Sequence, residues 1–242
     1  MPSISNTHGS GAVITARNSN DISGLIINDT TGRNAIFING KVGYYNIYNN
    51  AIYLINGNGS NGGIVFIDSA LDAFIINNTL IGTDNSRTGG IIVNNCSGNF
   101  MISNNSLMGL DENSGLYLGI GVNYNSSYLF CSIIDNILNF SLKASNTAIG
   151  VRVGYISSAM DTNILIADNT INNISRGILR QLNAGIGVQV GGSISTTVRN
   201  NKVNTLNPIE MPAYNFQTTG EASLSQINFA PDNIGNITSS DF

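Results

Sequence analysis

Three side chains in the middle of the chain have the chemistry to act on a polysaccharide. Arg152 could contact an acidic sugar, and Asp161 and Glu112 could serve as acid or base. A glycoside hydrolase needs two carboxyl groups about 5–10 Å apart, and the sequence does not give that distance. Arg152, Asp161 and Glu112 are therefore catalytic candidates of a lyase or hydrolase whose geometry stays open.

A polar column beside glycines predicts a sugar-binding groove. The chain repeats a small residue followed by alternating aliphatic residues, and aligning these segments places Asn123, Arg152 and Gln189 in one outward column. The glycines that form a bare stripe beside this column are Gly121, Gly150 and Gly187. Amides, one arginine and a nearby ring suit sugar binding in a shallow groove, so the carbohydrate-binding candidates are Asn123, Arg152, Gln189 and Tyr155. Alternatively, the glycines leave room for a packed loop or a subunit partner.

Other chemistries lack the residues that they need. The only histidine is His8, so neither a Ser/His/Asp triad nor a zinc site with the two cysteines can be assembled. We expect no metal site and no cofactor. The 10 Lys and Arg and the 14 Asp and Glu are scattered singly, which argues against a nucleic-acid partner. No apolar run approaches the ~18 residues of a transmembrane helix.

The elements that position these residues form a repeat. The motif Asn/Asp-Asn-x-aliphatic recurs with its second Asn in steps of 27 to 33 residues, at Asn50, Asn78, Asn105, Asn136, Asn169 and Asn201. A second motif alternates strictly with the first and begins at Ala35, Gly63, Gly90, Gly119, Ala148 and Gly185. Each period therefore contains at least two short strands.

Such a period is too short to bury its own apolar face. Stacking equivalent strands about 4.8 Å apart pairs each backbone group with the neighbouring turns and aligns like side chains. Asn tolerates the left-handed backbone of turns and can bond the Asn of the next turn, so we interpret the Asn column as scaffold. Asp135 and Asp168 replace the first Asn of the motif and are expected to be turn acceptors. We predict an all-β, single-stranded parallel β-helix of about seven turns between Gly11 and Asn207.

The Asn-x-aliphatic ladder with interleaved Gly-Ile strands resembles the repeats of the pectate-lyase-like superfamily. That group includes pectate lyases, polygalacturonases, phage tailspikes and bacterial surface proteins. The resemblance covers roughly residues 11–207 and implies a right-handed β-helix, the hand that parallel crossovers favour. It is specific for fold and not for function. The chain lacks the Asn-Thr-Asp, Asp-Asp, Gly-His-Gly and Arg-Ile-Lys set of polygalacturonases.

The end of the repeat divides the chain. Residues 1–207 are expected to form the β-helix, and residues 208–242, which contain Pro208, Pro212 and Pro231, an irregular C-terminal tail or cap. At about 3.3 Å per strand residue, Cys96 and Cys131 are too far apart for a disulfide, so two free, mostly buried thiols are expected.

Three functions fit these observations. The scarcity of His, Lys and carboxylate clusters favours a non-enzymatic module that binds a polysaccharide or surface glycan, such as an adhesin, a tailspike-like protein or a fibre segment. Such a module would be extracellular or on a cell or virion surface. The alternatives are a polysaccharide lyase or glycoside hydrolase, and a structural spacer that forms homo-oligomers through the glycine stripe or the C-terminal tail.

Overall fold

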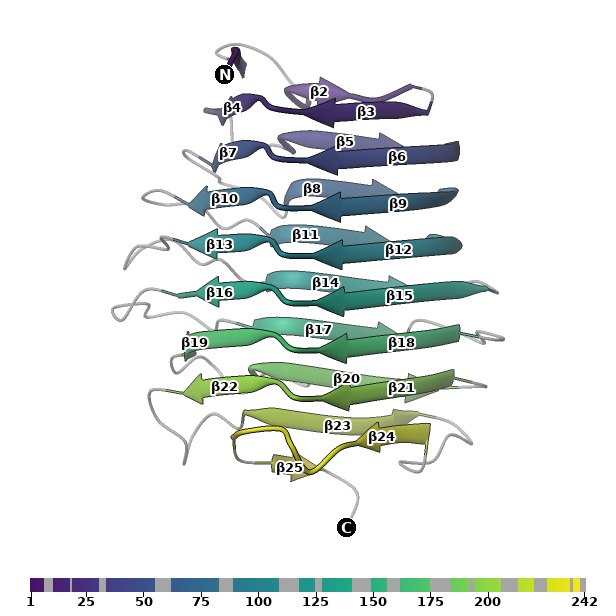
Figure 1. Ribbon diagram of the computed structural model, residues 1–242. Coiled ribbons are helices and arrows are strands. Elements are labelled where there is room, and N and C mark those ends of the chain that lie inside the picture. Colours follow the sequence, from purple (N-terminus) through teal and green to yellow (C-terminus); the bar gives the residue numbers. More distant parts are fainter. Residues whose placement is uncertain are drawn as a thin grey trace.

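The computed structural model shows an all-β solenoid made of three parallel sheets, which confirms the predicted fold class (Figure 1). The structure describes residues 1–6, 11–17, 19–30, 34–54, 62–82, 89–108, 118–124, 128–140, 149–155, 162–174, 184–191, 194–205, 213–219, 226–235 and 237–239. The sheets take strands in rotation along the chain, so each period contains three strands. We call the sheets A, B and C.

Sheet A consists of β1 (Ser3–Asn6), β4 (Ile26–Asp29), β7 (Ala51–Leu54), β10 (Thr79–Gly82), β13 (Ser106–Met108), β16 (Ile137–Asn139), β19 (Thr170–Ile174) and β22 (Lys202–Thr205). Sheet B consists of β2 (Ile14–Thr15), β5 (Ile36–Asn39), β8 (Gly62–Ile67), β11 (Gly89–Asn94), β14 (Leu118–Tyr124), β17 (Ile149–Tyr155), β20 (Ile186–Gly191), β23 (Tyr214–Thr219) and β25 (Ile237–Ser239). Sheet C consists of β3 (Asn20–Ser23), β6 (Val42–Tyr48), β9 (Ala70–Ile76), β12 (Gly98–Ser103), β15 (Leu129–Ile134), β18 (Thr162–Ala167), β21 (Ile194–Arg199) and β24 (Ile227–Phe229).

The coil is right-handed. In Figure 1 the near strands of sheets C and A run to the left, the fainter strands of sheet B run to the right, and the chain descends from its N-terminus. The sheets contain eight, nine and eight strands, so the extent differs slightly from the predicted seven turns. The difference arises because the stack exceeds the predicted range at both ends: β1 precedes Gly11, and β23, β24 and β25 follow Asn207.

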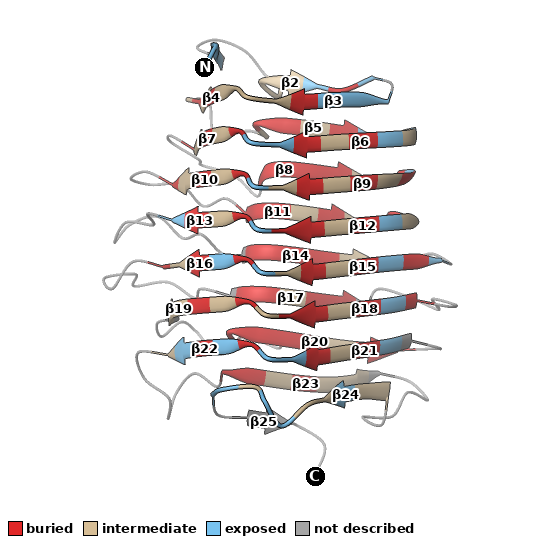
Figure 2. Ribbon diagram, viewed as in Figure 1, coloured by how far each residue is buried: buried red, intermediate tan, exposed pale blue. Residues whose placement is uncertain are grey.

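Aliphatic columns fill the interior, and Figure 2 shows that buried residues recur at similar places in successive strands. In sheet A one inward column is continuous from coil to coil, and its members are 3% exposed or less: Ile27, Ile52, Leu80, Leu107, Leu138, Ile171 and Val203. Burying one such side chain contributes about 1.5–3 kcal/mol. Cys96 and Cys131 are free and buried in the same interior, as predicted.

The small residue near the start of the second motif lies against the inward aliphatic column of sheet A. Buried glycines occupy this position in five successive coils: Gly63, Gly90, Gly119, Gly150 and Gly185. A Cβ on Gly63 would stand 2.6 Å from Leu80 Cδ2, and one on Gly150 would stand 2.7 Å from Ile171 Cγ2. Real Cβ atoms essentially never make contacts this short, so only glycine fits without a shift of the neighbours.

The Asn column forms the predicted ladder. Asn136, which is fully buried, donates from Nδ2 to Asn169 Oδ1 at 3.0 Å and accepts at Oδ1 from both N and Nδ2 of Asn105 at 3.0 Å. The same pattern links Asn50 to Asn78 and Asn169 to Asn201. The residue before each ladder Asn has a φ of 50° to 57°, in the left-handed region: Asn49, Asn77, Asn104, Asp135, Asp168 and Asn200. Asp168 Oδ1 accepts a hydrogen bond from Asn200 Nδ2, as expected of a turn acceptor.

The expectation of an irregular tail from residue 208 is wrong for its described parts. Strand β23 pairs with β20, β24 pairs with β21, and Asn233 accepts from Asn201 at 3.0 Å as a seventh member of the ladder. Three aromatic rings pack together in the C-terminal coil. The ring centroid of Phe229 lies 5.0 Å from that of Tyr214 and 5.3 Å from that of Phe216. Burial, followed by the charge of Asp232, raises the pKa of Tyr214.

Candidate functional site

The outer face of sheet B differs from the predicted polar column because the register of β17 is shifted. Ile120 pairs with Val151, which places Arg152 between Gly121 and Gly187. Asn123 instead pairs with Asn94 on one side and Gly154 on the other. Asn123 and Arg152 therefore belong to adjacent columns.

The glycine stripe is wrong for the same reason. Gly150 belongs to the buried column that faces sheet A, whereas Gly121 and Gly187 lie on either side of Arg152. The error arose because Ala148 was aligned with the glycines that open the other segments, whereas Gly150 occupies that position in the structure. A shift of two residues along a strand keeps every side chain on the same face, so the alternation of inward and outward residues did not reveal it.

Arg152 and Asn123 come together over Gly154. A Cβ on Gly154 would stand 2.8 Å from Asn123 Oδ1, 3.5 Å from Arg152 Nε and 3.7 Å from Arg152 Nη2. Arg152 Nε is buried and has no hydrogen-bond partner among the residues that the structure describes. A buried donor without a partner costs about 1–3 kcal/mol, so this nitrogen of Arg152 does not stabilise the fold through the described residues.

The remaining predicted residues are only partly placed. Gln189 is half-buried and pairs in register with Gln217, and the backbone of Tyr155 pairs with Tyr124 in β14. Glu112 and Asp161 lie outside the described residues, so the catalytic hypothesis with Arg152 stays a prediction. Within the described ranges, no group of three His, Cys, Asp or Glu could hold a metal ion. The described part of the chain also contains no helix of the length and apolarity that crossing a membrane requires.

Sequence reasoning missed a strip of rings and polar groups on the outer face of sheet C. We define the aromatic strip by two ring pairs with a polar pair between them: Tyr44, Phe74, Asp72, Asn99, Phe130 and Tyr128. The rings of Tyr44 and Phe74 lie 5.6 Å apart, and those of Tyr128 and Phe130 lie 5.9 Å apart. Tyr44, Tyr128 and Phe130 are 45%, 57% and 40% exposed.

The register of sheet C sets the spacing of the aromatic strip. Tyr44 pairs with Asp72, and Asn99 pairs with Phe130. Asn99 donates from N and Nδ2 to Asp72 Oδ1 at 3.0 and 2.7 Å, which holds the carboxylate in place. Tyr44 and Phe130 are three coils apart, or roughly 14 Å at the spacing of paired strands. The available signal was the alternation in Val42–Tyr48, where Tyr45 points inward and Tyr44 outward.

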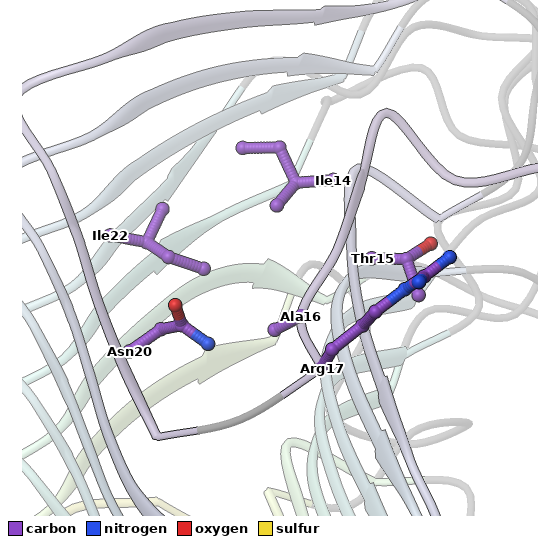
Figure 3. Close-up of a pocket in the computed structure, with 6 residues that line it drawn as sticks. All are labelled: Ile14, Thr15, Ala16, Arg17, Asn20 and Ile22. Atoms are coloured by element: carbon purple, nitrogen blue, oxygen red, sulfur yellow. The ribbon is translucent and has the colours of Figure 1, made fainter.

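A pocket of about 290 Å³ lies at the N-terminal end of the solenoid (Figure 3). Its lining combines apolar and polar side chains of the first coil: Ile14, Thr15, Ala16, Arg17, Asn20 and Ile22. Ile14, Ala16 and Ile22 belong to or pack against the hydrophobic core, so the pocket adjoins the core in the first coil.

Comparisons with known proteins identify no relative of this chain. No family model matches the chain, and no curated protein or solved structure matches it significantly. The structure itself supports a parallel β-solenoid with asparagine ladders.

Proposed function

We propose that the chain is a non-enzymatic β-helix module that binds an extended glycan along the outer face of sheet C. The observation that carries this proposal is the aromatic strip, in which exposed rings flank a hydrogen-bonded Asp72–Asn99 pair. Rings offer flat apolar faces for the C–H faces of sugars, and carboxylate and amide groups bind hydroxyls with defined direction.

The scaffold supports recognition of a long chain. Strands stacked about 4.8 Å apart present side chains at a spacing comparable to one sugar unit. Because these side chains stand on a hydrogen-bonded sheet, little conformational entropy is lost when a glycan binds.

The charge of this face favours a largely neutral glycan. In the described strands of sheet C, the charged side chains are Asp21, Asp72 and Arg199. Asp21 accepts from Asn46 Nδ2 at 2.8 Å, and Asp72 is held by Asn99. A polymer of uronic acids would meet two carboxylates here and no nearby cluster of cations.

The proposal also covers the location of the protein. Glycan binding by a β-helix of pectate-lyase-like type suits an extracellular module on a cell or virion surface, such as an adhesin, a tailspike-like protein or a fibre segment. The outer face of sheet B around Arg152 and Asn123 is a second candidate surface, supported by the guanidinium Nε of Arg152, which has no hydrogen-bond partner among the described residues. This second surface would suit an acidic sugar.

The experiment is a panel of neutral and acidic polysaccharides incubated with the purified chain. Binding is read by retention on immobilised glycan, and chemistry by new reducing ends and by the ultraviolet absorbance of unsaturated uronates. We expect retention on at least one neutral glycan without either product. Unsaturated products would show a lyase and reducing ends alone a hydrolase, whereas a panel without any retention would leave the structural spacer.

A further inference from the structure

Two exposed rings of the aromatic strip stand in one column along the solenoid axis. Tyr44 pairs with Asp72 in the next coil. Asn99 donates to Asp72 from the coil after that, and it pairs with Phe130 in the following coil. The exposed Asn163 continues the same column beyond Phe130. The column therefore presents a ring, a carboxylate, an amide and a second ring in four successive coils.

The polar pair between the two rings has capacity for further hydrogen bonds. The donors N and Nδ2 of Asn99 both bond Oδ1 of Asp72. A carboxylate has about four acceptor sites on its two oxygens, and this pair does not use Oδ2. Asn99 is exposed, and its side-chain oxygen is a further acceptor. Sugar hydroxyls can therefore donate to this pair in both coils between the rings.

The neighbouring outward column of sheet C is mostly apolar. Phe74, Met101 and Leu165 are half-buried members of this column, and Ser132 lies between the last two. The ring of Phe74 lies 5.6 Å from that of Tyr44. A chain that covers the ring column would thus have an apolar border along one side, which suits the C–H groups of a sugar.

Sheet C keeps the ring column straight. From β6 to β21 the described pairs advance one residue at a time on both strands, and Figure 1 shows these strands stacked above one another. Tyr44 and Phe130 are three coils apart, or roughly 14 Å at the spacing of paired strands. A glycan that stacks on both rings must therefore be extended and straight over about four sugar units.

We propose that the aromatic strip binds a flat, unbranched ribbon of β-1,4-linked neutral hexoses, such as glucose or mannose, that runs along the solenoid axis. One sugar stacks on Tyr44, another stacks on Phe130, and the units between them bond the Asp72–Asn99 pair. The inference rests on the proposed glycan binding and adds the linkage and the direction of the chain. A β-1,4 linkage gives an extended ribbon, whereas an α-1,4 linkage curves the chain away from a straight column.

The first test compares oligomers of two to six sugar units by titration calorimetry. The probes are β-1,4-linked glucose and β-1,4-linked mannose, and α-1,4-linked glucose is the matched control. We expect the affinity of at least one β-1,4 series to rise about tenfold or more between two and four units and to change little beyond four. The α-1,4 oligomers should bind at least about tenfold more weakly at equal length.

The second test distinguishes a glycan along the axis from one along strand β6. Tyr48 lies on β6 like Tyr44 and is 37% exposed, but it is outside the ring column. Tyr44→Ala and Phe130→Ala should each weaken binding of the four-unit oligomer about fivefold or more, whereas Tyr48→Ala should bind like the parent chain. Thermal unfolding checks each variant, and leucine replaces alanine at any position where alanine lowers the unfolding temperature.

A loss of affinity in Tyr48→Ala without a loss in Phe130→Ala would overturn the axial direction. Equal binding of α- and β-linked oligomers, binding of neither β-1,4 series, or an affinity that levels off at two units would also overturn the inference. In each of these cases, retention of another glycan that depends on the aromatic strip would leave the proposed function standing. A polysaccharide panel without any retention would contradict both.

Discussion

Gly119 lies so close to Leu138 that no Cβ fits between them. The same Cβ would stand 2.6 Å from the backbone oxygen of Gly150, and a backbone atom cannot turn aside as a side chain can. Sheets A and B therefore meet through glycine in this coil, and the closeness of the two sheets depends on that residue.

We predict that Gly119→Ala lowers the free energy of unfolding by about 1–3 kcal/mol, the usual cost of overpacking. Gly11→Ala is the control, because a Cβ on Gly11 meets nothing within 4 Å. Urea unfolding followed by circular dichroism measures both. Equal stability of Gly119→Ala and the parent chain would show that the sheets separate easily.

The ladder predicts that replacing a buried asparagine by alanine lowers the free energy of unfolding more than replacing an exposed asparagine. Asn136→Ala removes the Oδ1 acceptor of Asn105 N and Nδ2 and leaves both donors buried, so we expect a loss of about 2–5 kcal/mol. Asn204, which is exposed and makes one side-chain bond to Asn172 at 2.6 Å, is the control and should lose at most about 0.5 kcal/mol as Asn204→Ala. The denaturation midpoints of the two variants measure this difference. Similar losses of stability in both variants would contradict a cooperative ladder.

The repeat shows how far the fold could be predicted. The ladder was visible because each of these buried Asn residues follows a turn residue and is followed, two positions later, by an aliphatic residue of sheet A. Asn233 escaped notice because Gly235 stands where that aliphatic residue would be. The shift at Arg152 could not be seen, because both alignments keep the alternation of inward and outward residues.

The site was less predictable than the fold. The strip on sheet C depends on which residues of different coils become neighbours. The strands of this sheet could be located from the aliphatic residues before each ladder Asn, but their outward residues follow no repeated motif. Asp72 and Asn99 are 27 residues apart, and only the register brings them into contact.

The thiols should be inert in the folded protein. Burial raises the pKa of Cys131 to about 12 and that of Cys96 to about 11, from an ordinary value of 9.0. Because the folded values are raised, the neutral thiols stabilise the fold below about pH 9, and this contribution is lost as the pH rises through 11 and 12. We expect no reaction with a thiol reagent at pH 8 until denaturant is added, and a Cys131→Ala variant should react at one thiol per unfolded chain. Rapid labelling of the native chain would contradict the buried placement.

Arg152 should be dispensable for folding. Arg152→Met keeps an unbranched apolar side chain and removes the buried Nε, which has no partner among the described residues, so the free energy of unfolding should stay level or rise by up to about 1 kcal/mol. Arg199→Met, at an exposed position, is the matched control and should be neutral. Thermal unfolding of the two variants provides the comparison, and a clear loss of stability in Arg152→Met alone would mean that the guanidinium group stabilises the fold.

The most direct measurement for glycan binding on sheet C is the affinity of a retained glycan for the parent chain and for Tyr44→Ala/Phe130→Ala, determined by titration calorimetry. Both rings belong to the aromatic strip, so the double variant should bind at least about tenfold more weakly while it unfolds at nearly the same temperature. Tyr53→Ala, which removes a half-buried ring from the outer face of sheet A, should bind like the parent chain. Unchanged affinity in Tyr44→Ala/Phe130→Ala, or an equal loss in Tyr53→Ala, would contradict binding along sheet C.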